Sequence, residues 1–214
     1  NGAATDAGAV TFGSGTSGIS GAVSVANSLV GTTANDVVGA DGVTALSNGN
    51  YVVRSTDWNN GAATSAGAVT FGSGTTGISG AVSAANSLVG TTTDDVVGAD
   101  GVTALSNGNY VVRSSAWNNG AATFAGAVTF GSGTTGVSGA VSAANSLVST
   151  TANDFVGGLA ITLLSTGNYV VRNPCWTNGA AACAGAVTFG SGTTGVSGAV
   201  SAANSLIGST INDQ

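Results

Sequence analysis

The chain has 214 residues and few charges: nine Asp and three Arg, with no Lys, Glu or His, give a formal net charge of −6. Charged residues make up 6% of the chain, against roughly 25% in typical soluble domains, so ion-pair networks cannot hold its fold. The acidic balance argues against nucleic acid as a partner and against polybasic contact with a membrane. No apolar run approaches the ~20 residues needed to span a bilayer, so no membrane insertion is expected.

A long internal repeat dominates the sequence. The segment NGAAT begins at Asn1, Asn60 and Asn119, and its variant NGAAA begins at Asn178, each 59 residues after the last. The segments GAVTFGSGT, SGAVS, ANSL and GNYVVR return in the same register, and only 154–166 departs. The period is long enough for one supersecondary unit per repeat.

The repeat boundaries follow if each unit is read from its recurring Asp. This reading divides the chain into a partial repeat that supplies the later strands of a unit, two full repeats, and a last repeat that carries both Cys residues. Together they are expected to form one domain. The ranges are 1–35, 36–94, 95–153 and 154–214.

Short β-type runs alternate with turn residues in every unit. Gly, Asn and Ser separate these runs, and no stretch shows a sustained 3.6-residue apolar period. The sequence therefore predicts an all-β protein with about four strands per unit. Around the second copy the expected runs are 68–71, 78–84, 87–89, 102–105 and 110–113.

Four short strands in a 59-residue unit favour a β-propeller-like arrangement of stacked sheets. The alternative is a β-solenoid, which would show a shorter sub-period of about 20 residues. Only a weak similarity is present, between GAVTF and GAVSA, 12 positions apart. The propeller-like interpretation is favoured and the solenoid stays open.

The order of motifs within a unit resembles a known family. VVG, then GVTALSNGNYVVRS, a Trp loop and AGAVTFGSG are similar to the FG-GAP repeat of integrin-α-type β-propellers. They also resemble tandem repeats of large secreted bacterial adhesins of the filamentous-haemagglutinin type. FG-GAP turns often carry a calcium loop, but the equivalent turns 47–50, 106–109 and 165–168 contain no carboxylate. We expect plain hairpin turns there, with no metal and no cofactor.

Catalysis has few parts to draw on. Without His, Lys or Glu, only paired Asp residues could do general acid–base work. Asp36, Asp95, Asp154 and Asp213 recur at the repeat period, which indicates a role in the fold of each unit, such as capping a turn. We expect that the chain is not an enzyme.

Arginine recurs once per unit, at the end of the YVVR motif. Arg54, Arg113 and Arg172 are expected to form structural pairs with the recurring Asp36, Asp95 and Asp154. The alternative is a ring of Arg residues that binds an anionic ligand.

One Trp per unit lies beside Asn side chains in a loop. Such a group could bind glycans, with the indole ring stacked on a sugar and the amide bound to its hydroxyls; weak sites would then gain avidity by repetition. The alternative is that each ring covers the gap between neighbouring sheets. The candidate ligand-binding residues are Trp58, Asn59, Asn60, Trp117, Asn118, Asn119, Trp176 and Asn178.

Both Cys residues belong to the last copy. Cys175 and Cys183 are eight positions apart, and the earlier copies have neither. A pair that appears together predicts a local disulfide and an oxidising compartment; two free buried thiols are the alternative.

These observations predict a non-enzymatic structural or adhesive repeat module, extracellular or on the cell surface, that assembles into a surface layer, matrix or fibre. The alternative is a lectin-like propeller that binds glycans. Expected partners are further copies of the chain, in a homo-oligomer or filament, or the remainder of a longer repeat protein. Because the chain begins at Asn1 without Met, we expect a mature or excerpted product.

Overall fold

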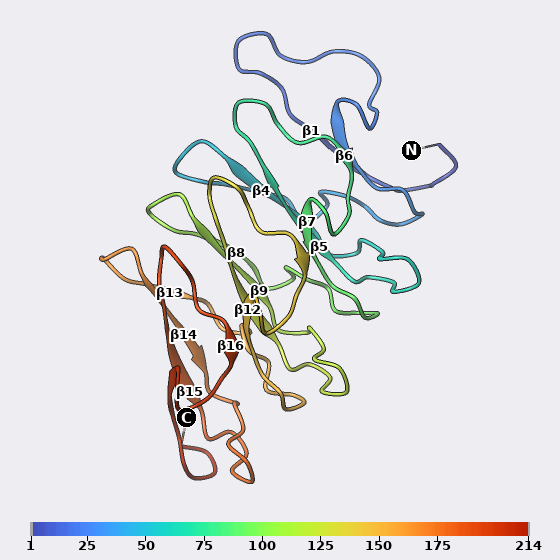
Figure 1. Ribbon diagram of the computed structural model, residues 1–214. Helices are drawn as coiled ribbons and strands as arrows, with labels where there is room; N and C mark the ends of the chain where they lie inside the picture. Colours follow the sequence, from blue (N-terminus) through green and yellow to red (C-terminus); the bar gives the residue numbers. More distant parts are fainter. Residues whose placement is uncertain (1, 214) are drawn as a thin grey trace.

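The computed structural model describes residues 2–213, and all regular structure in this part of the chain is β. Four sheets follow one another in chain order, each built mainly from the antiparallel strands of one repeat (Figure 1). The prediction of an all-β protein of repeated units is confirmed. None of the described residues forms a helix long and apolar enough to cross a membrane.

The two complete middle sheets have the same construction. Sheet 2 contains β3 (Val43–Ala45), β4 (Tyr51–Ser55), β5 (Ala68–Gly72) and β7 (Ser87–Val89), and sheet 3 contains β8 (Gly101–Ala104), β9 (Tyr110–Ser114), β10 (Ala127–Gly131) and β12 (Ser146–Val148). Neighbouring strands within each set are antiparallel.

The two end sheets are shorter. Sheet 1 contains β1 (Ala9–Thr11) and β2 (Ser28–Val30), and sheet 4 contains β13 (Thr162–Leu163), β14 (Tyr169–Asn173), β15 (Ala186–Gly190) and β17 (Ser205–Ile207). Three two-residue strands complete the first three sheets. They are β6 (Gly80–Ala81) in sheet 1, β11 (Gly139–Ala140) in sheet 2 and β16 (Gly198–Ala199) in sheet 3.

Each of these two-residue strands belongs to the repeat that follows the sheet it joins. It lies in the segment between the third and last antiparallel strands of its own unit, which we call the tongue: residues 14–27, 73–86, 132–145 and 191–204. The sequence predicted one strand over 78–84; only Gly80–Ala81 is a strand, and it pairs with β2 of the preceding sheet. Strand exchange of this kind links every sheet to the next.

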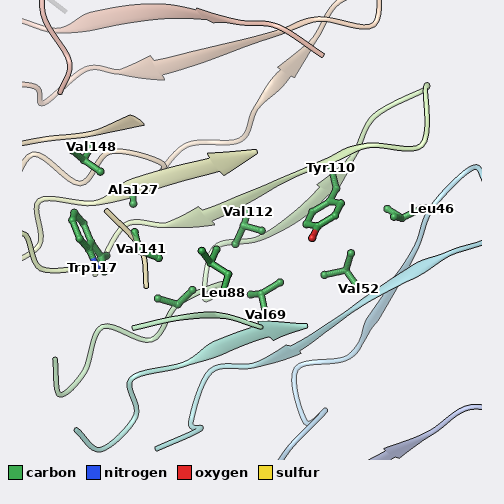
Figure 2. Packing of buried hydrophobic residues seen from close by; sticks show 11 residues of the cluster. Leu46, Val52, Val69, Leu88, Tyr110, Val112, Trp117, Ala127, Val141 and Val148 are labelled. Atoms are coloured by element: carbon green, nitrogen blue, oxygen red, sulfur yellow. The ribbon is translucent and has the colours of Figure 1, made fainter. Parts of the chain in front are cut away.

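The sheets pack face to face, and both faces of the inner sheets are buried. Val52 and Leu88 of sheet 2 point toward sheet 3, where Tyr110 and Val112 lie in the same apolar cluster (Figure 2). The neighbouring Val111 belongs to the next cluster, between sheets 3 and 4. Because successive side chains of a strand point to opposite faces, a strand buried on both sides needs the uninterrupted apolar run YVV.

The stack is open. The N-terminus and the C-terminus lie at opposite ends of the molecule, and the first and last sheets do not meet (Figure 1). The face-to-face packing expected of propeller blades is present, but the described residues form no closed ring.

Local sequence explains one close contact within each of sheets 2, 3 and 4. Tyr110 pairs across the strands with Gly131, and a Cβ atom on that glycine would lie 2.1 Å from the tyrosine ring. Tyr51 and Tyr169 lie against Gly72 and Gly190 in the same way. The AVTFG motif therefore ends in glycine because the tyrosine ring occupies the space of a side chain.

Candidate functional site: the junction between repeat units

The most regular structure in the molecule is the junction between one unit and the next. The tongue pairs in parallel with the last strand of the preceding sheet, in the register Leu29↔Gly80, Leu88↔Gly139 and Leu147↔Gly198. A further backbone hydrogen bond follows each pair. Val82 donates to Val30 (3.1 Å), Val141 to Val89 (3.1 Å) and Val200 to Val148 (3.0 Å).

The Asn residues of the hairpin turns form a second part of the junction. The side-chain amides of Asn48 and Asn50 both donate to the carbonyl of Gly133 in the next unit, each at 2.7 Å. Asn107 and Asn109 donate in the same way to Gly192, at 2.7 and 2.9 Å. The turns expected to be plain hairpins therefore also tie consecutive units together along one edge of the stack.

The recurring Asp residues cap turns, and all of them except the exposed Asp213 are buried. Asp36 accepts hydrogen bonds from the backbone amides of Thr32 and Thr33, both at 2.8 Å. Its other oxygen accepts from the backbone amide and the side chain of Asn59, at 3.1 and 2.9 Å. Asp95 repeats this pattern. These carboxylates are fully buried, and their acceptor atoms are occupied by groups of the chain itself.

Asp154 caps the last unit with a smaller set of donors. It accepts from the backbone amide of Thr177 (3.1 Å) and from the hydroxyl of Ser149. Burial raises the pKa of the Asp154 carboxyl, and these hydrogen bonds offset part of the rise.

The arginines do not pair with these carboxylates, so the predicted Asp–Arg pairs are wrong. Arg54 donates to the backbone carbonyls of Asp41 and Gly98, and the equivalent Arg113 donates to those of Asp100 and Gly157. Each guanidinium thus joins the connection that leads into its own sheet to the connection that leads into the next sheet. The reason is geometric: the carboxylates are already enclosed by amide donors, whereas these carbonyls point toward the guanidinium.

Arg172 differs from the other two arginines. Leu159 stands where Asp41 and Asp100 stand in the earlier units, and Arg172 is exposed, with no hydrogen bond from its guanidinium to a described residue. It lines a hollow of about 410 Å³ on the outer side of sheet 4, together with Leu159, Val187 and Leu206. The repeat pattern did not predict this hollow, although the departure of 154–166 from the repeat was its signal.

The tryptophans and their Asn neighbours do not form a glycan site. Trp58, Trp117 and Trp176 are at most 7% exposed, and each belongs to one of the three apolar clusters between sheets. They cover the gap between neighbouring sheets, and no indole face is free for a sugar.

The Asn residues beside the tryptophans are occupied within the fold as well. Asn59 and Asn118 bind the buried Asp36 and Asp95. The side chains of Asn60, Asn119 and Asn178 donate to the carbonyls of Gly90, Ser149 and Gly208, at 2.8, 2.8 and 2.9 Å.

The two Cys residues lie together at the surface of the last unit. Both are free thiols in the structure, Cys175 exposed and Cys183 half-buried. A hydrogen bond between them raises the pKa of Cys175, and burial and the nearby Asp154 add to the rise. The structure thus brings the pair together without the bond, and the disulfide stays a prediction.

A surface aromatic pair was also missed. Phe124 and Phe155 stack with ring centroids 5.8 Å apart, and both are 43% exposed. The residues one period earlier are Ser65 in the second unit and Val96 in the third. This departure of the third and fourth units from the repeat was the available signal.

Comparison with protein families gives the repeat an identity. The family model described as "Repeat of unknown function (DUF5650)" matches residues 1–40, 45–99, 104–158 and 163–214. The chain belongs to this repeat family. Four copies of the DUF5650 repeat thus cover nearly the whole chain, and the comparison does not identify FG-GAP or integrin-type repeats. No curated protein and no solved structure matches the chain.

Proposed function

We propose that this stack of DUF5650 repeats is a non-enzymatic structural module that spaces and joins surfaces outside the cell. The observation that supports this most is how the recurring polar side chains are used. The Asp carboxylates accept backbone amides, and the turn Asn residues and two of the arginines bind carbonyls of the following unit. Polar residues that recur from unit to unit thus cap turns or join one unit to the next.

An extended scaffold gains from such a design. Each unit contacts only its neighbours, so length can be changed by adding units without altering any contact. The stack also places its termini at opposite ends (Figure 1), as a spacer requires.

An extracellular setting is the second part of the proposal. Its support is the near absence of charged residues, the resemblance to FG-GAP-like repeats and to those of secreted adhesins, and the adjacent thiols of Cys175 and Cys183. An adhesive role fits the same setting. Glycan binding through the tryptophans is not proposed, because their rings are buried.

The spacer role can be tested with concatenated chains. Each copy of residues 1–212 is joined to the next by residues 36–59 of the same sequence, so that the 59-residue period continues across the joint. Arrays of one, two and four such copies should grow in length in proportion to the number of units. Solution scattering and particle images measure that length. Arrays that close into rings of constant diameter would contradict a spacer.

Location and adhesion need the source cells. An antibody against the chain should label intact cells without permeabilisation, and deleting the repeats should weaken attachment or thin the surface layer. Labelling confined to the cell interior would contradict the extracellular part of the proposal.

A further inference from the structure

The outer face of sheet 4 is an apolar surface whose equivalents on the inner sheets are covered by the next unit. Leu206 is 81% exposed, whereas the equivalent Leu88 and Leu147 are fully buried. Val187 is 43% exposed, whereas the equivalent Val128 is fully buried. In the inner sheets these positions pack against the next unit.

The edge of sheet 4 is also open. β2, β7 and β12 each pair in parallel with the tongue of the following unit. β17, the equivalent strand, pairs only with β15 among the described residues. Its other side thus presents the same unpaired backbone that accepts a tongue in the three other sheets.

The tongue of the first unit pairs with no sheet among the described residues. Residues 14–27 already have the internal hydrogen bonds of the other tongues: Ser24 N–H donates to Asn27 Oδ1, and Asn27 Nδ2 donates to the carbonyl of Ala22, both at 2.9 Å. The matching bonds of the second unit join Ser83, Asn86 and Ala81, at the same distances. The internal structure of this tongue is thus already formed, and its strand pairing is missing among the described residues.

The side chains of this first tongue show the same lack of a partner. Val23 is 62% exposed, whereas the equivalent Val82, Val141 and Val200 are buried. Ile19 is exposed too, whereas the equivalent Ile78 packs against the cluster between sheets 1 and 2.

We propose that the tongue 14–27 of one copy docks on the open edge and face of sheet 4 of a second copy, head to tail. The proposal deepens, and rests on, the structural role proposed above. The three internal junctions set the register: Leu206 lies opposite Gly21 and Ile207 opposite Ala22, and the amide of Val23 donates to the carbonyl of Ile207.

Two further contacts follow from the same geometry. Inside the chain Gly77 lies so close to Phe12 that a Cβ atom on it would be 2.5 Å from the phenylalanine Cβ, and Gly136 and Gly195 meet Phe71 and Phe130 in the same way. Phe189 of the second copy, which is 56% exposed, is thus placed to receive Gly18 of the first copy.

A second copy fits this surface better than an unrelated partner, because three internal junctions already join a tongue of nearly the same sequence to an edge of nearly the same sequence. The contact joins two different surfaces, so it does not close after two copies and leads to filaments. Among the described residues, only β1 comes before the tongue 14–27, and no equivalent of β8 or β9 is present. The contact is therefore smaller than an internal junction, and we expect association that depends on concentration.

Sedimentation velocity over a range of concentrations tests this contact on the whole chain. Val23→Asp and Leu206→Asp each place a charge in the proposed contact and should weaken association by about a hundredfold or more. Both side chains are exposed in the single copy, so the fold should persist, which circular dichroism checks.

Matched controls lie next to each test site. Val25→Asp changes a residue whose equivalents in the other units, Ala84, Ala143 and Ala202, are exposed. Ile211→Asp changes a residue whose equivalents, Ala34, Thr93 and Ala152, are exposed as well. Both controls should associate like the unchanged chain.

Mixing separates head-to-tail docking from other modes. The Val23→Asp chain keeps an intact sheet 4 and the Leu206→Asp chain keeps an intact tongue, so the mixture should form dimers and no larger species. Loss of association in Leu206→Asp alone would show two sheet 4 faces packed together and would overturn the proposal. Association that survives both substitutions would overturn it as well.

A chain that stays monomeric at every concentration would also overturn end-to-end docking. The structural role is judged separately, by the length of concatenated arrays. A monomer whose arrays lengthen with each unit keeps the spacer and loses the docking.

Discussion

Asp95 is a fully buried carboxylate that four hydrogen-bond donors surround. Asp95→Asn replaces one acceptor oxygen by an NH₂ group that faces amide donors, so we expect a loss of about 3 kcal/mol in the free energy of unfolding. Asp94→Asn is the matched control, because Asp94 is exposed and Asn already occupies the equivalent positions 35 and 153. Urea titrations measure both, and equal losses for the two variants would contradict the cap.

Tyr110 and Tyr169 make the stability of the stack sensitive to alkali. Burial raises the pKa of each phenol to about 12. The backbone of Val137 lies near the Tyr110 hydroxyl and that of Val196 near the Tyr169 hydroxyl, and each lowers the pKa slightly. Neither hydroxyl makes a hydrogen bond to a described residue. The folded chain therefore keeps its phenol protons at a pH where the unfolded chain, with a pKa near 10, loses them. Stability present below pH ~10 should fall by about 3 kcal/mol per tyrosine as the pH rises toward ~12.

The double variant Tyr110→Phe and Tyr169→Phe checks this, because Phe keeps the packing over Gly131 and Gly190. Its unfolding midpoint in urea should change less between about pH 8 and about pH 12 than that of the unchanged chain. This pH range covers the tyrosine pKa near 10 in the unfolded chain and the pKa of about 12 in the folded chain. If ultraviolet absorbance showed every tyrosine ionising near pH 10 in the folded chain, the explanation would be wrong.

At the scale of the element, the hairpin between β3 and β4 depends on a glycine in the tongue. A Cβ atom on Gly74 would lie 1.8 Å from the carbonyl oxygen of Gly49 in that turn. Gly74→Ala should therefore push the turn away and reduce the free energy of unfolding by about 1–3 kcal/mol. Gly15 is the equivalent glycine of the first unit and has no atom within 4 Å of such a Cβ, so Gly15→Ala in dilute solution should have little effect.

Most strands could be predicted from the sequence, and one class could not. The run 87–89 is strand β7 to the residue, and 68–71 is one residue shorter than β5. These strands pair within their own repeat, so local composition and turns define them. The run 78–84 is reduced to β6, because its partner belongs to the sheet before it. A pattern that repeats identically in every unit does not tell which unit a strand joins.

At the scale of the whole molecule, the ends of the stack should open more readily than its middle. The sequence AVTFG forms β5, β10 and β15, so intrinsic amide exchange rates are the same at all three. β10 is covered on both faces, whereas Val187 and Phe189 of β15 are exposed. Since protection follows burial and local contacts, amides of β15 should exchange at least about tenfold faster than those of β10.

Hydrogen exchange followed by mass spectrometry checks this, best in the Leu206→Asp variant at low concentration so that docking cannot cover β15. Peptides from β5 give the internal reference for a covered strand. Equal protection at β10 and β15 would mean that the stack opens as one unit, without the nearest-neighbour behaviour of repeat proteins.

The sequence by itself determined the 59-residue period, the all-β class and the shortage of catalytic side chains, because each is a property of residue order or composition. The tertiary structure decided which groups meet. It placed the tryptophans between sheets, gave the Asp and Arg residues separate backbone partners, and passed each tongue to the preceding sheet. The physical reason is that burial and hydrogen-bond partners depend on the neighbouring unit. In a near-perfect repeat, every unit offers the same candidates, and only the packing selects among them.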